Sequence, residues 1–327
     1  MTFLETYLVT KCITPYKLIN LILRQLSIFL SAISRKIVLL GNPWSYSIEP
    51  SNVCNLHCRE CFTGRGLSKR KPHFISEEDF TLAIKQIKRT ALNLFLYFQG
   101  EPYLNPLFTR LIEIAHKNRI FTVTSSNGHL INNDNAEKTV IAGLDKIIIP
   151  LDGYDQESYS TYRHGGSFAA AKTAITLIAN AKRRLKKRNP IIEVQCLASK
   201  NTENHLKEIK QIALECGANK FCVKTMQIET EDGFKTFLPD NQQLSRYTKD
   251  YKLKHPIKFC RRVFQSVVIT SELNILPCCY DKDTQFILGN LHQETLPKII
   301  KQQKNLNLLH KIELLKQRPL MCCNCGG

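Results

Sequence analysis

Between residues 44 and 226 short apolar runs alternate with longer segments of helical periodicity, and this alternation constrains the fold more than any other feature. The apolar runs that have the length and composition of strands are 44–49, 94–98, 121–125, 146–151, 191–197 and 220–226. Helical patterns occupy 105–118, 133–142, 167–187 and 202–216, and Ser76 is placed to cap a further helix. Strands that alternate with helices form a parallel sheet. The sequence therefore predicts an α/β fold, a partial (β/α)6 TIM-like barrel, with a flat doubly wound sheet as the alternative.

The chain divides into four predicted parts. Residues 1–43 form an amphipathic N-terminal helical segment, and 44–228 form the partial barrel. Residues 229–258 are a polar connector, and 259–327 are a small cysteine-rich α+β extension. We expect functional side chains at the C-terminal ends of the barrel strands, because loops from neighbouring parallel strands meet at that edge.

The N-terminal segment is rich in Leu and Ile from residue 18 to residue 40. Its longest charge-free run, 25–34, is too short to span a bilayer. A narrow polar stripe recurs at steps of three and four residues, formed by Asn20, Arg24, Ser27, Ser31 and Arg35. Such a helix packs against the protein body, which we favour, or lies in a membrane interface.

The charge balance and the cysteine distribution bear on compartment and partners. A net charge of +18 favours anionic partners such as nucleic acid, an acidic membrane face or a phosphorylated substrate, and a solvated basic surface is an equal alternative. The 13 cysteines are clustered, which is typical of metal sites in a reducing compartment. The first ten residues lack the basic start of a signal peptide. We expect a cytoplasmic protein, with membrane association through 18–40 as the open question.

The first cysteine cluster follows the first predicted strand. Cys54, Cys58 and Cys61 have the spacing Cys-x3-Cys-x2-Cys. Three thiolates make a poor structural zinc site, which normally has four ligands, and His57 is badly placed to be the fourth. A [4Fe–4S] cluster held by three cysteines keeps one iron open for another ligand. The spacing therefore predicts a catalytic iron–sulfur cluster.

Four further motifs follow successive strands and carry a family resemblance. They contain Gly100 and Glu101 after the second strand, Asn127 after the third, and Asp152 and Arg163 after the fourth. Together with the three cysteines, these motifs resemble those of the radical S-adenosylmethionine (SAM) superfamily over about 180 residues.

The resemblance implies a role for each motif residue. Glu101 would accept hydrogen bonds from the SAM ammonium group, and Gly100 would let the backbone approach closely. Arg163 would pair with the SAM carboxylate. Asn127 and Asp152 would contact the ribose hydroxyls or hold neighbouring loops.

The resemblance also implies the reaction. An electron donor such as a flavodoxin or ferredoxin would reduce the cluster, SAM would be cleaved reductively, and the resulting radical would take a hydrogen atom from a substrate. That substrate would be a peptide or protein side chain, or a small molecule. Two departures from the family pattern stand out: Glu60 occupies a usually aromatic position before the third cysteine, and Gln99 replaces a glycine.

The C-terminal cysteines resemble a SPASM extension, which carries auxiliary [4Fe–4S] clusters. The resemblance implies one auxiliary cluster held by Cys260, Cys278, Cys322 and Cys325. A hairpin with a turn at 271–274, where Asn274 would take the left-handed conformation, separates the first two of these. A zinc ribbon is the alternative, because four thiolates suit either metal.

Six further cysteines lie outside the two predicted ligand sets. The neighbours Cys279 and Cys323 leave the ligand set open, while Cys12, Cys196, Cys216 and Cys222 have the character of small buried residues.

The sequence also allows two other functions. An iron–sulfur electron carrier is a second hypothesis, although such a protein would not need residues that bind the SAM ammonium and carboxylate groups. A basic nucleic-acid-binding protein is a third, but no binding motif accompanies the charge, and the chain has one Trp.

Overall fold

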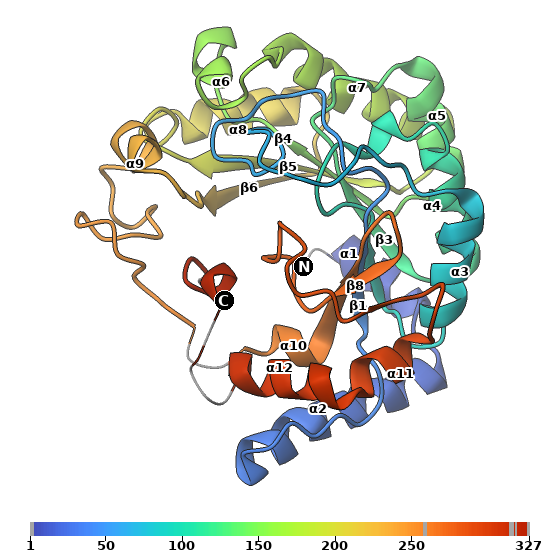
Figure 1. Ribbon diagram of the computed structural model, residues 1–327. Helices are drawn as coiled ribbons and strands as arrows, with labels where there is room; N and C mark the ends of the chain where they lie inside the picture. The colour runs from blue at the N-terminus through green and yellow to red at the C-terminus, as the bar shows by residue number, and fades with distance from the viewer. Residues whose placement is uncertain (1–2, 258–259, 314–316, 318, 326–327) are drawn as a thin grey trace.

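The computed structural model describes residues 3–257, 260–313, 317 and 319–325. A sheet in the order β6-β5-β4-β3-β2-β1-β7-β8-β9 curves through the molecule, and helices ring its outer face (Figure 1). Strands β1 to β6 are parallel, which confirms the α/β fold and the partial barrel. These strands are β1 (Ser45–Ile48), β2 (Asn93–Phe95), β3 (Phe121–Ser125), β4 (Lys146–Pro150), β5 (Ile191–Ala198) and β6 (Lys220–Thr225).

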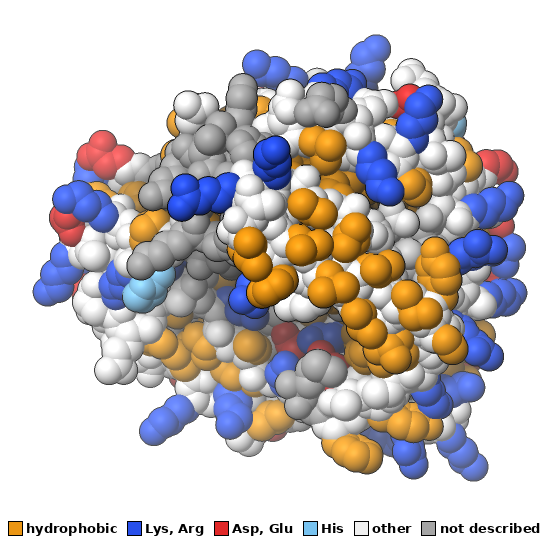
Figure 2. All heavy atoms as spheres, turned by 90° about the horizontal axis from the view of Figure 1, so that it is seen from below, with side chains coloured by type: hydrophobic (Ala, Val, Ile, Leu, Met, Phe, Trp, Pro, Cys, Tyr) orange, Lys and Arg blue, Asp and Glu red, His pale blue; other side chains and the backbone are white. Residues whose placement is uncertain are grey.

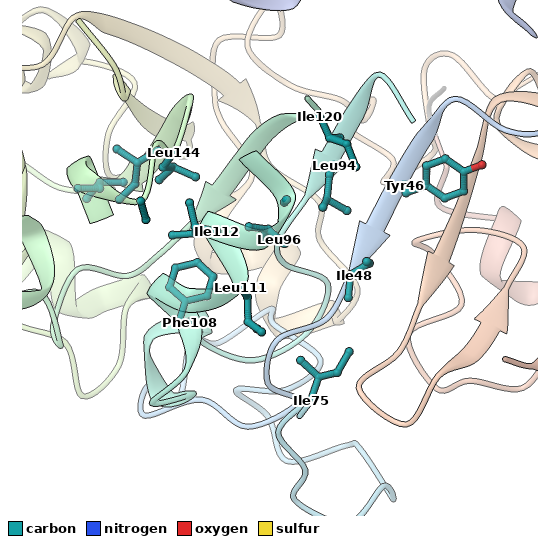
Figure 3. Packing of buried hydrophobic residues seen from close by; sticks show 14 of the residues in the cluster. Tyr46, Ile48, Ile75, Leu94, Leu96, Phe108, Leu111, Ile112, Ile120 and Leu144 are labelled. Carbon is teal, nitrogen blue, oxygen red and sulfur yellow. The ribbon is translucent and has the colours of Figure 1, made fainter. Parts of the chain in front are cut away.

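The outer layer follows the predicted helical periodicity. Its helices are α3 (Glu77–Ile87), α4 (Phe108–Lys117), α5 (Asn133–Ile141), α7 (Phe168–Arg184) and α8 (Leu206–Glu215). Ser76 caps α3 as predicted, because its hydroxyl accepts a hydrogen bond from the Asp79 N–H at 3.0 Å. Buried residues of β1, β2 and α4 form part of the main core between sheet and helices (Figure 3). Burial of this apolar surface is the main force that holds the helices on the sheet.

In the barrel and the connector, two short helices were not predicted from the sequence. They are α6 (Gln156–Tyr162), after β4, and α9 (Glu231–Phe237), inside the polar connector 229–258. Each begins at a side-chain cap, Asp155 for α6 and Thr230 for α9, and each is too short to show a clear apolar period.

The C-terminal segment continues the barrel sheet. After α10 (Arg262–Gln265), strand β7 (Ser266–Ile269) pairs in parallel with β1. The predicted hairpin is present as β7 and the antiparallel β8 (Asn274–Leu276), and β9 (Gly289–Asn290) completes the sheet. The expectation for its turn was wrong: Leu273 adopts the left-handed conformation, with φ 63°, and Asn274 begins the next strand. Helices α11 (Leu296–Lys301) and α12 (Gln303–Glu313) follow.

The N-terminal segment consists of two helices. Helix α1 (Phe3–Lys11) packs against inward-facing residues of β3 and β4, and its Glu5 pairs with Lys146 at 3.1 Å. Helix α2 (Pro15–Ser34) begins and ends earlier than the predicted 18–40. It ends because Arg35 takes the left-handed conformation, so Arg35 does not belong to the polar stripe. Within the described residues, α2 is the one helix whose length and composition would allow it to cross a bilayer.

Candidate functional site

The eight residues predicted to hold the catalytic cluster and SAM line one cavity. It lies at the C-terminal edge of the parallel strands and has a volume of about 190 Å³. The lining includes Cys54, Cys58, Cys61, Gly100, Glu101, Asn127, Asp152 and Arg163. The structure thus brings together side chains from four strand–loop junctions that are up to 109 positions apart in the sequence, from Cys54 to Arg163.

The loop after β1 carries Cys54, Cys58 and Cys61 and is called the cysteine loop below. Close backbone contact with the loop after β2 holds it in place. Gly100 has φ +72°, and a Cβ there would lie 2.4 Å from the Ser51 carbonyl oxygen. The next residue, Glu101, donates its N–H to the Val53 carbonyl at 2.7 Å. Gly100 therefore allows the close approach that the sequence predicted, and the partner of that approach is the cysteine loop itself.

Glu101 is buried and its carboxylate is held by three hydrogen bonds. Oε1 accepts from the Ser126 hydroxyl at 2.7 Å and from the Tyr103 N–H at 3.2 Å, and Oε2 accepts from the Asn127 N–H at 2.8 Å. Burial raises the pKa of Glu101 despite these donors. A buried carboxylate of this kind is stabilised by a cation, and the ammonium group of SAM has the charge that the site needs.

Arg163 and Asp152 form an ion pair in the wall of the cavity, in which Asp152 is buried and Arg163 is partly exposed. Arg163 Nε and Nη2 each lie 2.7 Å from Asp152 Oδ2, and Nη1 lies 3.7 Å from the Cys58 sulfur. Burial opposes the charge of Arg163, but Asp152 and Cys58 outweigh it and raise the pKa. Asp152 Oδ1 also accepts the Leu197 N–H at 2.6 Å. Asp152 therefore positions Arg163 between the cysteine loop and β5.

Asn127 holds the cysteine loop from the β3 side. Its Nδ2 donates to Asn55 Oδ1 at 2.8 Å and lies 3.8 Å from the Cys54 sulfur, while Oδ1 accepts the His129 N–H at 3.0 Å. Of the two roles predicted for Asn127, these contacts fit the one in which it holds a neighbouring loop.

Glu60 points away from the cavity and ties the cysteine loop to the connector. Its carboxylate accepts from the Glu229 N–H at 2.7 Å and from the Thr230 hydroxyl at 2.6 Å, at the start of α9. Gly233 leaves room for it, since a Cβ there would lie 2.3 Å from Glu60 Oε1. This explains the departure from the aromatic pattern: the position carries a structural carboxylate.

Burial raises the pKa of two thiols in the cysteine loop. Burial raises the pKa of Cys54 to about 11, and burial also raises that of Cys58, although Arg163 opposes the shift. Cysteines bind a cluster as thiolates, so cluster insertion must release protons. The metal–sulfur bonds must also offset the free energy that burying the thiolates costs.

The four C-terminal cysteines predicted as ligands line a second, apolar cavity. Cys260, Cys278, Cys322 and Cys325 surround it together with Ile257, Val263, Tyr280 and Met321. Cys279 and Cys323 are exposed and do not line it. In each adjacent pair that the sequence left open, one cysteine therefore lines the cavity and its neighbour does not: Cys278 lines it and Cys279 does not, and Cys322 lines it and Cys323 does not. Of the other four cysteines, Cys12 and Cys196 are buried as expected, while Cys216 and Cys222 are partly exposed.

A third cavity, of about 480 Å³, lies beside both cysteine sites and was not predicted. It is lined by Phe62 of the cysteine loop, by Cys323 and Asn324 of the C-terminal cysteine segment, and by the aromatic side chains of Phe234, Tyr247, Tyr251 and Tyr280. Its aromatic residues come from the connector and from the loop after β8. Sequence reasoning missed it because these residues are far apart in the chain and share no motif.

Comparison with known families identifies the class of protein. Residues 48–195 match the model of the radical SAM superfamily, and residues 260–326 match the SPASM model of an iron–sulfur cluster-binding domain. The chain belongs to the radical SAM superfamily and carries a C-terminal SPASM domain. These domains imply a [4Fe–4S] cluster with SAM and an auxiliary iron–sulfur cluster in the C-terminal segment. An iron–sulfur cluster is therefore a better interpretation of the C-terminal cysteines than a zinc ribbon.

Similar proteins include a maturase and a protein whose structure was solved with a precursor peptide bound. The chain is 30% identical over 142 residues to the mycofactocin maturase MftC of Mycobacterium ulcerans, an alignment that covers 43% of this chain and 38% of that protein. The chain therefore matches less than half the length of this curated relative. Streptococcus suis SuiB bound to the precursor peptide SuiA has a TM-score of 0.65 at 17% identity, covering 91% of this chain and 73% of that one. AnSMEcpe with bound AdoMet has a TM-score of 0.61 at 18% identity, covering 87% and 89%. The two structures share the fold.

Proposed function

We propose that the protein cleaves SAM reductively and uses the resulting radical to take a hydrogen atom from a peptide side chain. The observation that carries this proposal is the single cavity that unites three loop cysteines with the buried carboxylate of Glu101 and the guanidinium of Arg163. When bound, the cluster and SAM supply a 5′-deoxyadenosyl radical. An electron carrier without SAM chemistry would not need the Glu101 and Arg163 side chains in this cavity.

The chain's own residues bind and orient the cofactors in this proposal. Cys54, Cys58 and Cys61 hold the cluster, and Glu101 accepts hydrogen bonds from the SAM ammonium group. Asn127 and Asp152 keep the cysteine loop and Arg163 in place, so Arg163 presents a fixed positive charge beside the cluster. Asp152 holds Nε and Nη2, and Nη1 contacts the Cys58 sulfur, so the second N–H groups of Nη1 and Nη2 are the donors left for the SAM carboxylate.

Glu101→Gln should weaken SAM binding by about 1.5–3 kcal/mol, the range for a hydrogen bond to a charged group. Titration calorimetry under anaerobic conditions measures this, and the iron content should stay that of the wild type. Glu203→Gln is the matched control, because the Glu203 carboxylate also accepts two backbone N–H groups but lies outside the cavity. Equal SAM affinity in both variants would contradict the role given to Glu101.

We further propose that the substrate is a peptide that binds in the aromatic cavity. The cavity adjoins the cysteine loop through Phe62, and its volume of about 480 Å³ lies in the range of ligand sites. Phe234 and Tyr251 stack at 4.6 Å and offer an apolar platform, while the Glu229–Lys282 pair lies at the wall. The named activity of MftC and the SuiA-bound state of SuiB support the peptide class.

Hydrogen transfer from a labelled extract distinguishes the two substrate classes. The reconstituted enzyme is incubated with the peptide fraction or the small-molecule fraction of deuterated cells, and deuterium in 5′-deoxyadenosine is measured. We expect label from the peptide fraction and its loss in Tyr251→Ser, with unlabelled 5′-deoxyadenosine still formed. Tyr7→Ser, another exposed tyrosine, is the control. Label from the small-molecule fraction alone would make the substrate a metabolite.

We also propose a cytoplasmic enzyme that is reduced by a flavodoxin or ferredoxin. A chain with a net charge of +18 favours docking of an electron donor that carries an acidic surface. Peripheral membrane contact is proposed for the 18–40 segment.

A further inference from the structure

Helix α2 buries its polar face and exposes its apolar face, the reverse of the usual arrangement. The polar stripe, Asn20, Arg24, Ser27 and Ser31, is buried against the body. The outward side chains are large and apolar: Tyr16, Leu18, Ile19, Ile22, Leu26, Phe29, Leu30 and Ile33. Ile22, Phe29 and Ile33 are 54%, 61% and 66% exposed. Helices on soluble proteins normally bury the apolar face, so this surface is built to be covered by something else.

The inward polar face is satisfied by backbone groups, which fixes the helix in this orientation. Ser27 and Ser31 hydroxyls accept N–H groups of the segment 38–42, at 2.7 and 2.9 Å. The Asn20 amide both donates to and accepts from the same segment, at 2.9 Å each. Rotation of α2 to bury its apolar side would break these bonds and leave the polar atoms unsatisfied.

Two buried cations also hold the helix against the body. Arg24 donates from Nε and Nη2 to the Phe264 carbonyl oxygen, and Lys17 donates from Nζ to the Arg119 carbonyl at 2.6 Å. A bilayer-spanning α2 would have to withdraw both charges into hydrocarbon. The arrangement therefore fits a helix that lies along a membrane surface and excludes a spanning one.

Basic side chains surround the apolar face. At its N-terminal end a cavity of about 280 Å³ is lined by Tyr16 together with the exposed Lys88, Arg89 and Arg119. At the other end Arg35 and Lys36 are exposed. Figure 2 shows hydrophobic side chains gathered on this face of the molecule, with Lys and Arg around them. An apolar face rimmed by cations is complementary to acyl chains beneath anionic headgroups.

We propose that α2 docks the protein on the surface of an anionic phospholipid membrane. The outward side chains enter the acyl boundary, and the basic cavity beside Tyr16 receives phosphate groups of the lipids. Docking of this kind places the enzyme on the membrane surface without inserting the barrel into it. The proposal rests on α2 and the basic residues beside it, and it holds whatever the substrate of the radical reaction is.

Co-sedimentation of the full chain with vesicles tests the proposal. We expect binding to vesicles of phosphatidylcholine mixed with phosphatidylglycerol, little binding to phosphatidylcholine alone, and weakening by salt. The triple variant Ile22→Gln/Phe29→Gln/Ile33→Gln should lose binding. Lys88→Gln/Arg89→Gln should weaken it on the order of ten-fold or more, because each basic residue near an anionic surface contributes about a few-fold in affinity.

Matched controls distinguish docking through α2 from nonspecific binding to vesicles. Ile141→Gln/Leu214→Gln removes exposed apolar residues from α5 and α8, and Lys207→Gln/Lys210→Gln removes exposed charges from α8. Both should bind vesicles like the wild type. Absence of vesicle binding, or equal binding by the triple variant, would overturn the proposal. So would a dimer in sedimentation velocity that the triple variant converts to a monomer without any vesicle binding, since a second copy would then cover α2.

Discussion

Replacing Cys54, Cys58 and Cys61 together by Ala should abolish reductive cleavage of SAM. The three thiols line one cavity with Glu101, and no other described cysteine lines it. Without them the open iron that SAM needs has no support. After anaerobic reconstitution we expect no reductant-dependent 5′-deoxyadenosine, measured by chromatography, and about half the iron of the wild type, about four atoms in place of about eight for two four-iron clusters.

The control is a variant that removes as many thiols without touching either cysteine cavity. Cys216→Ala/Cys222→Ala/Cys323→Ala changes three partly or fully exposed cysteines that line neither cysteine cavity. It should keep both the iron and the 5′-deoxyadenosine of the wild type. Normal 5′-deoxyadenosine formation by the Cys54/Cys58/Cys61 variant would refute the catalytic assignment, and loss of all iron would show that the two cysteine sites fold as one unit.

The strands of the barrel were predictable because they are short, largely buried and rich in apolar and β-branched residues. β3 was predicted at its observed limits, and β4 within one residue. The barrel helices α4, α5, α7 and α8 were also found from their period, and α3 from its Ser76 cap. The seven-residue α6 and α9 were missed, since so few residues hold barely two turns and their caps Asp155 and Thr230 resemble those of ordinary turns.

The catalytic cavity was predictable for a different reason. Parallel strands end at one edge, so motifs that each follow a strand must meet there, however distant they are in sequence. The motifs could not show which of these residues contact one another. Arg163 binds Asp152 and approaches Cys58, and Glu60 binds the start of α9. These contacts depend on loop conformations that no periodicity encodes.

The orientation of α2 shows the limit of pattern reasoning most clearly. A polar stripe on an apolar helix predicts which residues share a face, and Asn20, Arg24, Ser27 and Ser31 do share one. It does not say which face meets the body, because that depends on backbone groups of the segment 38–42 and of Phe264 that become partners only in the folded chain.

Cys260→Ser/Cys278→Ser should remove the auxiliary cluster while the catalytic one remains. The four cysteines around the apolar C-terminal cavity come from three separate segments, so a shared cluster ties α10, the loop after β8 and the tail together. We expect iron to fall from about eight to about four atoms and the tail to become sensitive to protease. SAM cleavage by an artificial reductant should persist, because the SAM cavity shares no residue with this one.

The adjacent cysteines supply the decisive comparison for this ligand set. Cys279→Ser/Cys323→Ser changes the same residue type one position away, but both residues are exposed and neither lines the cavity. This variant should keep about eight irons. If it lost four irons and Cys260→Ser/Cys278→Ser kept them, the ligand set would have to be redrawn around the exposed pair. If both variants lost four irons, six cysteines would serve the tail, and a further auxiliary cluster or a shared ligand would be required. A cluster held by four buried or half-buried thiolates leaves no open iron, and the second site then serves electron transfer or folding and not SAM binding.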